Sequence, residues 1–289
     1  MEGTSGTDVS WWYTDVERTV TYFVQRTTNG TLPYLRPLMT GISAVIITRN
    51  EAHNIVRCLV PLKGLVDEVI LVDAQSTDAT CELAKEQGAV VVERKWTDYS
   101  DQKNFANSCA TGPYILSLDA DEVLSPELIA SIRKHTAQGL IGAYGVHRLT
   151  NYCGHWIHYS GWYPDAKVRL FPKQDTRWEG AHVHEELQLA PGTTITPLEG
   201  DLLHYSYTSV ADHLERLERY SDLHAHKMNA AGKRGGPIKR YLSPVVKFIQ
   251  TFFFQLGFLD GVAGWRIAWY SAYGVYMKYT KLATLRKAE

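Results

Sequence analysis

The sequence lacks the glycine-rich loops that hold phosphates in many nucleotide-binding enzymes. Neither GxGxxG nor GxxxxGK followed by Ser or Thr occurs among the 289 residues, which argues against dinucleotide oxidoreductases and P-loop enzymes. The four cysteines, Cys58, Cys81, Cys109 and Cys153, form no CxxC pair, so we expect buried free thiols in a reducing compartment. The chain shows no basic segment followed by an apolar one at its start, and we expect a cytoplasmic protein without a secretory signal.

An excess of one charge is missing as well. The formal net charge is −1 and the pI is about 6.8, which argues against a generally basic nucleic-acid-binding protein, and we expect no nucleic-acid partner. With 45% hydrophobic and 21% charged residues, disorder, collagen and coiled coils are excluded. Charge is nevertheless unevenly placed, because residues 205–289 hold 13 Lys and Arg against 6 Asp and Glu. We expect the acidic front and the basic, aromatic back to meet different environments.

What is present is an alternation of apolar runs and helix-compatible segments. The runs are Ile42–Thr48, Glu68–Asp73, Ala89–Glu93 and Tyr114–Leu118, each short and continuous, as in strands buried on both faces of a parallel sheet. Helices are predicted over His53–Leu62, Thr77–Gln87 and Asp101–Cys109, with Ser76 and Ser100 as N-caps, and another begins at Ser125-Pro126. The alternation predicts an α/β fold with a doubly wound, mostly parallel sheet.

Acidic and short polar side chains collect where the predicted strands end. Thr48-Arg49-Asn50-Glu51 closes the first run, Asp73 closes the second, and Asp119-Ala120-Asp121 follows the fourth. Ligands of open α/β sheets bind beyond the carboxyl ends of the strands. Acids gathered at one edge repel one another unless a cation or donor groups lie among them. Two carboxylates two residues apart suit one hard divalent cation and its bound phosphates, and a solvated acidic turn before the Ser125 helix is the structural alternative.

Several segments resemble the nucleotide-sugar-binding half of an inverting family 2 glycosyltransferase with the GT-A fold. They are SAVIITRNEAHNI, VDEVILVDAQSTDAT, DQKNFA and YILSLDADEVLSPEL. A similarity to the lipopolysaccharide core β-1,4-glucosyltransferase group is carried by three later segments, KVRLFPK, RWEGAHVHEEL and GDLLHYSY. We accordingly expect an N-terminal extension (1–40), a GT-A catalytic domain (41–204) and a basic helical region (205–289). Within the catalytic domain, residues 41–125 form the expected nucleotide-sugar half and residues 126–204 the acceptor half.

The resemblance implies roles for individual residues. The residues expected to bind the nucleotide-sugar are Thr48, Asn50, Glu51, Asp73, Gln102, Lys103, Asp119, Arg169 and His184. Asp73 would accept the uracil N–H, with a turn cap as its structural alternative, and Lys103 at a helix start is otherwise a solvated side chain. Asp119, Asp121 and His204 would hold Mn²⁺ or Mg²⁺, although a lone histidine after an apolar pair is often a core residue.

Glycosyl transfer also needs a base that deprotonates the acceptor hydroxyl. The family pattern favours Glu185, with Glu186 as the second candidate, in Glu179–Glu186, where an exposed strand of mixed charge is the structural alternative. One base and a direct displacement would invert the anomeric carbon. His184 would orient that base or touch the diphosphate, and Arg169 would neutralise a phosphate or fix an acidic loop. Trp156, Trp162 and Tyr163 would form a platform for the acceptor sugar or pack in the core.

One motif match is interpreted as coincidence. Gln174–Trp178 fits the QxxRW pattern of processive polysaccharide synthases, but it precedes the candidate base and the chain has no long uninterrupted apolar span. We therefore predict transfer of a single sugar.

Residues 237–282 are rich in aromatic side chains, but Lys247, Asp260 and Arg266 interrupt the apolar stretch and argue against a transmembrane helix. Interfacial helices on the inner face of the cytoplasmic membrane are predicted, with basic residues toward anionic lipid. The basic residues in question are Lys233, Arg234, Lys239 and Arg240. An ordinary core helix pair or a homo-oligomer contact is the alternative.

The combined prediction is a metal-dependent inverting glycosyltransferase. It would move one hexose, glucose from UDP-glucose, onto a lipopolysaccharide core or another lipid-linked glycan at the membrane surface. A nucleotidyltransferase acting on sugar phosphates is a rival hypothesis, but such enzymes usually carry a glycine-rich loop where Thr48–Glu51 stands here. A non-catalytic, membrane-associated scaffold with the same fold is the third hypothesis, against which the acids Asp119, Asp121 and Glu185 argue.

Overall fold

The computed structural model describes residues 40–180, 185–233 and 235–285, together with three N-terminal strand assignments. Those strands, β1 (Ser10–Asp15), β2 (Val20–Gln25) and β3 (Arg36–Pro37), form a small antiparallel sheet. The chain divides into two compact units, neither of which is continuous in sequence. Unit 1 comprises residues 1–120, 132–144 and 169–196, and unit 2 comprises residues 121–131, 145–168 and 197–289.

Unit 1 is built on four parallel strands. They are β4 (Ile42–Thr48), β5 (Glu68–Asp73), β6 (Val90–Glu93) and β7 (Tyr114–Asp119), hydrogen-bonded in the order β6-β5-β4-β7. The four apolar runs therefore form the predicted strands, with ends within a residue of those expected. Burial on both faces holds for β4 but not for β6, because β6 is the edge strand and Val90 is 57% exposed.

Helices connect these strands as predicted, but two predicted caps are wrong. α1 (Ile55–Leu59) continues into a 3₁₀ turn, η1 (Val60–Leu62), and α2 (Thr80–Glu86) and α3 (Tyr99–Cys109) follow. α3 is capped by Asp98, whose side chain accepts from the Asp101 N–H, and not by Ser100. Ser76 donates to Asp73 instead of capping α2. The Ser125 cap is confirmed, since its Oγ accepts from the Leu128 N–H at the start of α4 (Pro126–Gln138).

The remaining strands extend the sheet in a mixed manner. The added strands are β8 (Glu122–Leu124), β9 (Ala143–Tyr152), β10 (His155–Ile157), β11 (Asp165–Pro172) and β14 (Ile195–Tyr207). Together with the parallel strands they form a nine-stranded sheet in the order β6-β5-β4-β7-β11-β9-β14-β8, in which β10 pairs with β9. β11 pairs antiparallel with β7, and β14 pairs antiparallel with β8. β12 (Arg177–Glu179) and β13 (Glu186–Gln188) form a separate hairpin. The predicted α/β fold of the GT-A type is confirmed, with its parallel part centred on β4.

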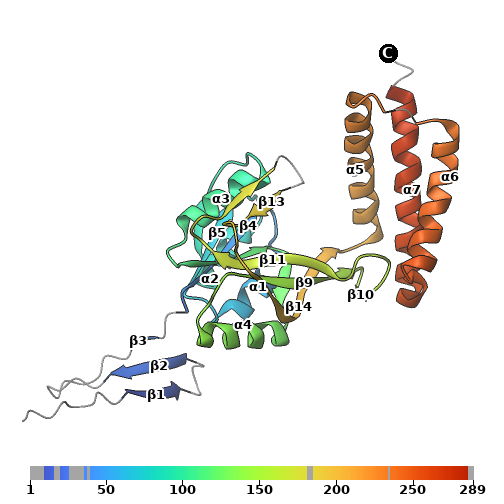
Figure 1. Ribbon diagram of the computed structural model, residues 1–289. Helices are drawn as coiled ribbons and strands as arrows, with labels where there is room; N and C mark the ends of the chain where they lie inside the picture. The colour runs from blue at the N-terminus through green and yellow to red at the C-terminus, as the bar shows by residue number, and fades with distance from the viewer. Residues whose placement is uncertain are drawn as a thin grey trace, which may run out of the picture. The chain divides into compact units, whose positions relative to one another are not determined.

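The expected C-terminal helical region is also present. α5 (Val210–Ala230), α6 (Pro237–Ile249) and α7 (Gly261–Leu285) are the long helices, and α7 packs against both others (Figure 1). A π-helical turn, η2 (Gln250–Phe254), and a 3₁₀ turn, η3 (Gly257–Asp260), join α6 to α7. Ile267 and Ala263 of α7 pack on Tyr152 and Ile157 in a buried cluster of unit 2.

A membrane-spanning helix is not found among the described residues. The segments 237–254 and 257–285 reach the required length and hydropathy only together, and they are bent by 72° where they meet.

All four cysteines are free thiols, as predicted. Cys58 and Cys81 are buried, whereas Cys109 and Cys153 are only half-buried, so the expectation of full burial is wrong for the latter two. Burial, reinforced by the neighbouring Asp73, raises the pKa of the Cys81 thiol to about 11. Cys81 is thus a neutral core thiol at ordinary pH.

Candidate active site

Lys103 is the centre of a charged cluster in unit 1. Its Nζ lies 3.4 Å from Oδ1 of Asp119, at the end of β7, and 3.2 Å from Oε1 of Glu185. The same ammonium group lies over the ring of Trp178, 4.6 Å from its centroid. Lys103 is 5% exposed, which excludes the solvated alternative for it. Because a buried ammonium is costly to leave unpaired, the two carboxylates are held together by a shared cation.

A second buried cation holds the other side of Asp119. Arg169, on β11, donates from Nη2 to Oδ2 of Asp119 over 2.8 Å and is 4% exposed. This contact corresponds to the predicted role of Arg169 in fixing an acidic segment, and its predicted role toward a phosphate stays a prediction. Asp119 is thus fixed through both oxygens, as expected of a carboxylate that must keep one orientation at the edge of the sheet.

Glu185 and Glu186 occupy different environments. Glu185 has a side chain that is 20% exposed and contacts Lys103, whereas Glu186 begins β13 as an exposed residue opposite Glu179 of β12. His184 lies outside the described residues, as does His182, so its role stays a prediction. Of the two candidate bases, Glu185 is the one in contact with the charged cluster.

The loops that follow β4 and β5 are hydrogen-bonded to each other. The Asn50 N–H donates to Ser76 Oγ, and the Asn50 side chain accepts from the Thr77 N–H, each over 2.8 Å. Asp73, 1% exposed, accepts from both the backbone and the hydroxyl of Ser76 over 2.7 and 2.5 Å. The turn-cap alternative for Asp73 is therefore present in the structure, and its contact with uracil stays a prediction.

Three further predicted nucleotide-binding residues lie close by in unit 1. Thr48 is buried at the end of β4, and its hydroxyl has no hydrogen-bond partner among the residues that the structure describes. The backbone N–H of Glu51 donates to Thr80 Oγ1. Gln102 is fully buried, and its Oε1 accepts from Arg94. Its amide nitrogen has no partner within the described part of the chain. Buried groups of this kind are uncommon and suit a site that gains hydrogen bonds when a ligand binds, although the roles of these residues stay predictions.

Asp121 and His204 meet in unit 2. Oδ2 of Asp121 lies 3.2 Å from Nε2 of His204, on β14. The other ring nitrogen of His204 is 3.3 Å from the hydroxyl of Thr150, on β9, which orients the ring so that Nε2 faces the carboxylate. A carboxylate oxygen and an imidazole nitrogen are suitable ligands for Mn²⁺, so the donor chemistry fits the predicted cation.

The described residues contain no group of three or more His, Cys, Asp and Glu side chains arranged to hold a metal. Asp121 and His204 form a pair, and the third predicted ligand, Asp119, has its carboxylate between Lys103 and Arg169. The three metal assignments therefore remain predictions.

A cavity of about 310 Å³ in unit 2 contains His204. Its lining residues are Arg148, Thr150, Gly161, Trp162, Pro164, Asp165, His204, Ser206 and Tyr207. Arg148 pairs with Asp165 over 2.7 Å and with the fully buried Glu122 over 3.5 Å. Burial acts to raise the pKa of Asp165, but Arg148 and Lys167 outweigh it and hold that pKa below its usual value. The cavity therefore combines fixed charges with aromatic walls.

The three aromatic residues that were predicted to form an acceptor platform, Trp156, Trp162 and Tyr163, make different contacts. Trp162 lines this cavity and stacks on Tyr207, with ring centroids 5.4 Å apart. Trp156 instead packs edge-on against Tyr205, and Tyr163 donates from its hydroxyl to Asp201.

Sequence reasoning missed several residues of these two sites. Thr150, Arg148 and Asp165 are single polar residues within strands, where an exposed position is the ordinary expectation, and no local pattern distinguishes them. Trp178 did have a signal, because it ends the QxxRW match that was set aside. Its contact with Lys103 places at least that residue of the motif in the charged cluster.

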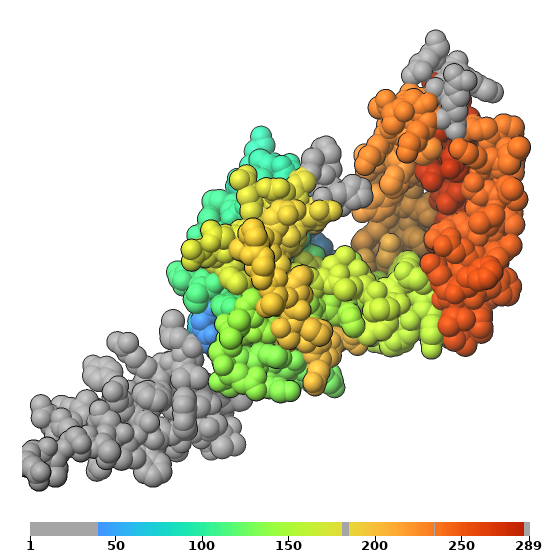
Figure 2. Space-filling view, viewed as in Figure 1, coloured from blue at the N-terminus to red at the C-terminus, as the bar shows by residue number. Residues whose placement is uncertain are grey.

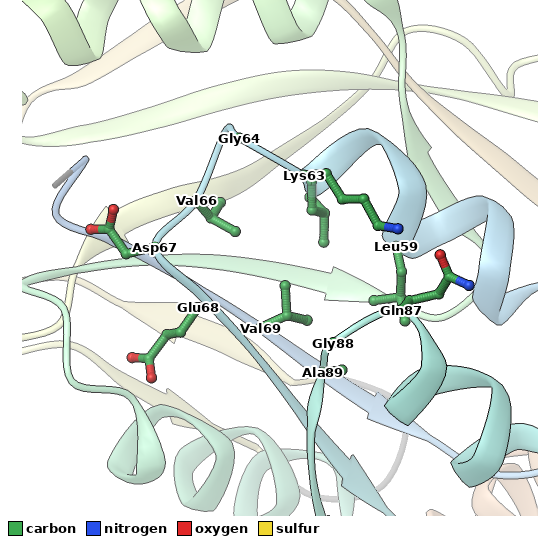
Figure 3. A pocket seen from close by; sticks show the side chains of 11 residues that line it. Leu59, Lys63, Gly64, Val66, Asp67, Glu68, Val69, Gln87, Gly88 and Ala89 are labelled. Atoms are coloured by element: carbon green, nitrogen blue, oxygen red, sulfur yellow. The ribbon is translucent and has the colours of Figure 1, made fainter. Parts of the chain in front are cut away.

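A hollow of about 160 Å³ in unit 1 contains none of the predicted site residues (Figure 3). It lies at the start of β5, where Asp67 accepts from the backbone of Thr40 and Gly41 and Glu68 accepts from Ser43 and Thr111. These bonds fasten the amino ends of the strands, opposite the edge at which ligands of α/β sheets bind.

The chain is similar to known glycosyltransferases. Residues 43–186 match the profile of the family described as Glycosyl transferase family 2. The chain is 30% identical over 257 residues to an uncharacterized glycosyltransferase of Rickettsia prowazekii, which covers 86% of this chain and 88% of that protein. It is 26% identical over 258 residues to a lipopolysaccharide core biosynthesis glycosyltransferase of Rhizobium meliloti, covering 82% of this chain and 93% of that protein.

Solved structures also match. The S. aureus protein TarS, residues 1–349 in complex with UDP-GlcNAc, has a TM-score of 0.42 and 14% identity over 86% of this chain and 92% of its own. Glucosyl-3-phosphoglycerate synthase from Mycobacterium tuberculosis, in complex with Mn²⁺, UDP-glucose and phosphoglyceric acid, has a TM-score of 0.31 and 24% identity over 39% of this chain and 44% of its own.

Proposed function

Because the chain belongs to glycosyl transferase family 2, we propose that it is a metal-dependent, inverting hexosyltransferase acting on a lipid-linked acceptor. It moves one hexose, glucose from UDP-glucose, onto a lipopolysaccharide core or a similar lipid-linked glycan. The observation that carries the proposal is the contact of one buried lysine with both Asp119 and Glu185. The lipopolysaccharide core relative supports the choice of acceptor.

The donor side of the reaction is assigned to the acids after β7. Asp121 and His204 would hold the divalent cation, and the spacing Asp119-Ala120-Asp121 brings a second carboxylate within two residues of it. When bound, the cation supplies positive charge that offsets the negative charge of the departing UDP. Lys103 and Arg169 keep Asp119 in one orientation, so that the carboxylate is available to a ribose hydroxyl without rearranging.

The acceptor side is assigned to Glu185. The acceptor oxygen forms a bond to the anomeric carbon as the bond from that carbon to the diphosphate breaks, and the hydroxyl proton passes to the Glu185 carboxylate. One displacement of this kind inverts the anomeric configuration. The contact with Lys103 restricts the rotamers of Glu185, and a base held in position contributes more than a freely moving one.

The cavity around His204 is the proposed acceptor site. Its ion pair of Arg148 with Asp165 offers donors and acceptors for sugar hydroxyls, and Trp162 offers an aromatic face on which a sugar ring stacks. An aromatic wall with a few fixed polar groups is the usual composition of a small-molecule site.

The membrane is the proposed location of the acceptor, and α6 supports it. The exposed side chains of this helix are mainly apolar, and they lie on one face at Ile238, Leu242, Val245 and Ile249, which are 74%, 56%, 52% and 40% exposed. The opposite face carries Arg240, which donates to the Tyr276 hydroxyl of α7. Of the two basic residues of α6 that were predicted to face lipid, Lys239 is exposed, whereas Arg240 contacts α7. Most of the other exposed side chains of α6 are apolar, unlike those of a water-exposed helix, as in an interfacial helix.

α7 exposes apolar side chains as well, and the outer surface of α6 is drawn in orange in Figure 2. Val262, Trp265, Trp269 and Tyr273 repeat at helical spacing on α7 and are 69%, 48%, 52% and 44% exposed. We refer to these four residues and the four of α6 as the apolar face. Aromatic and aliphatic groups of this kind suit the headgroup region of a bilayer.

A thermal-shift panel tests the donor and the cation. UDP-glucose, other UDP-sugars and GDP-sugars are added to the full chain with and without Mn²⁺. We expect a rise in melting temperature that requires a UDP-sugar and the cation together, because each ligand binds only the folded state. The cation-dependent part of the shift should vanish in Asp121→Asn and remain in Asp175→Asn, a change in a surface turn. An equal response to every nucleotide, with or without Mn²⁺, would contradict the proposal.

A further inference from the structure

A second cavity of unit 2, of about 340 Å³, lies among α5, α6 and α7. It shares Trp162 and Tyr207 with the proposed acceptor site, and no other residue of it has a role in transfer. Its remaining lining residues are His213, Arg216, Leu217, Tyr220, Ser221, His224, Lys247, Tyr270, Ser271, Gly274, Val275 and Lys278. A cavity of this volume suits a small ligand or the head of a larger one.

The charges around this cavity are all of one sign. Arg216, Lys247 and Lys278 contribute positive charge, and no Asp or Glu is among the lining residues. The guanidinium of Arg216 is already engaged by Asp212 and Ser206. Lys247 of α6 and Lys278 of α7 have no ion pair among the described residues.

Lys281, on the same helix, is neutralised by carboxylates of α5. Its Nζ lies 2.6 Å from Glu218 and 2.8 Å from Asp222 of α5. Lys278, one turn earlier on α7, contacts no carboxylate of the described residues and lies over the ring of Tyr279 instead, 4.8 Å from its centroid. The pair Lys247 and Lys278 thus presents positive charge that a bound anion would neutralise.

The same cavity has apolar walls. Leu217 of α5 and Val275 of α7 line it together with Tyr220 and Tyr270. Gly274 lets Leu217 pack closely on α7 in this wall, because an added Cβ would lie only 3.3 Å from the Leu217 side chain. Phosphate alone does not need apolar walls, whereas a phosphate attached to a hydrocarbon chain uses both features.

We propose that this cavity binds the phosphate group of an anionic lipid, with the phosphate at Lys247 and Lys278 and hydrocarbon against Leu217 and Val275. Two sources share this chemistry, a phospholipid of the bilayer and the diphosphate of a lipid-linked glycan, and the second source rests on the proposed function. Because Lys247 belongs to α6, a lipid bound here would be held by the helix that carries half of the apolar face.

Isothermal titration calorimetry of the full chain, without donor sugar or Mn²⁺, tests the site. The probes are dihexanoyl phosphatidic acid below its micelle concentration, geranyl diphosphate, the zwitterionic dihexanoyl phosphatidylcholine and inorganic phosphate. Lys247→Gln/Lys278→Gln is compared with Lys85→Gln/Lys227→Gln, which removes the same charge from exposed residues outside the cavity. We expect the cavity variant to bind one or both of the first two probes at least about tenfold more weakly than the control variant does, because the charge-assisted hydrogen bonds to the phosphate are lost.

Tighter binding of phosphatidic acid would identify a bilayer phospholipid as the ligand, and tighter binding of geranyl diphosphate a lipid-linked diphosphate. Gly274→Leu, which fills the cavity without changing charge, should weaken the same probe. Equal affinities of cavity and control variants, or inorganic phosphate binding as tightly as both amphiphiles, would overturn the proposal. Since no transfer is measured, a failure here leaves the catalytic proposal standing, and an inactive enzyme that binds these probes leaves this site standing.

Discussion

At the scale of single residues, the site depends on side chains that hold other side chains. Arg169 and Lys103 fix Asp119, Lys103 also contacts Glu185, and Thr150 orients His204. Only the outermost atoms of this arrangement would meet substrate or cation. The supporting contacts are therefore testable separately from the chemistry.

Thr150→Val removes the hydroxyl next to Nδ1 of His204 and keeps the shape of the side chain. We predict that the affinity for Mn²⁺ falls about tenfold, because groups that orient a metal-binding histidine are typically worth 10–100-fold in affinity. Binding of Mn²⁺ is followed by electron paramagnetic resonance, which requires no turnover. Thr150→Ser keeps the hydroxyl and should retain the affinity, and a Thr150→Val protein that binds Mn²⁺ as tightly as the parent would contradict the role.

At the scale of secondary structure elements, the apolar runs located the parallel strands because a central strand needs little besides continuous hydrophobicity. The edge position of β6 depends on neighbours that lie elsewhere in the chain. The Ser125 cap is local and was predicted, and the cap of α3 is also local but lies at Asp98, two residues before the predicted Ser100. Ser76 had the right residue type for a cap, but tertiary structure recruits it to bond Asp73 and Asn50. The two strands that carry Arg148 and Asp165 were not predicted, since the ion pair joining them spans 17 residues and leaves no local pattern.

The junction of β9 with α5 contains a histidine that should make stability depend on pH. His213 is buried against Tyr152, whose hydroxyl lies 2.9 Å from Nδ1 of the histidine. Burial lowers the pKa of His213 to about 4. Asp212 acts to raise this pKa, and Arg216 acts to lower it further. The unfolded chain takes up this proton near the ordinary value of about 6.5, before the folded chain does. Stability from this group is therefore complete above about pH 6.5 and is lost progressively as the pH falls toward 4.

We predict that His213→Gln has a lower melting temperature at neutral pH but a shallower decline between about pH 6.5 and 4. Glutamine keeps a hydrogen-bonding partner for Tyr152 and cannot titrate. Differential scanning fluorimetry across this range gives both curves, with His226→Gln on the exposed surface of α5 as the matched control. Parallel curves for the parent and His213→Gln would show that His213 does not contribute to the pH dependence.

At the scale of the whole molecule, the distribution of charge seen in the sequence has a structural counterpart. The acids end strands of the sheet, and the basic and aromatic tail forms the helices α5, α6 and α7. The sequence predicted this division because charge and hydropathy are summed over long segments. It did not predict which face of each helix is exposed, since that depends on how α7 packs between its neighbours.

Val245→Glu tests whether the apolar face binds lipid. Val245 is 52% exposed on α6, so a carboxylate there should not disturb the fold, but it would lose the transfer free energy of a valine side chain, about 1.5 kcal/mol. We predict about tenfold weaker co-sedimentation with vesicles of phosphatidylcholine and phosphatidylglycerol. Leu223→Glu introduces the same charge on α5, where Leu223 is 53% exposed and lies outside the apolar face, and should bind like the parent. Equal loss in both variants would point to charge alone.

The central claim is that Glu185 deprotonates the acceptor. The most direct measurement is the rate of UDP release from UDP-glucose with Mn²⁺ and lipopolysaccharide trimmed to its inner core, compared among the parent, Glu185→Gln and Glu179→Gln, an exposed residue of β12. A positioned base contributes about 10²–10⁴-fold, so Glu185→Gln should lose at least about a hundredfold in rate, keep its UDP-dependent thermal shift, and differ sharply from Glu179→Gln. A Glu185→Gln enzyme as active as the parent would contradict the account.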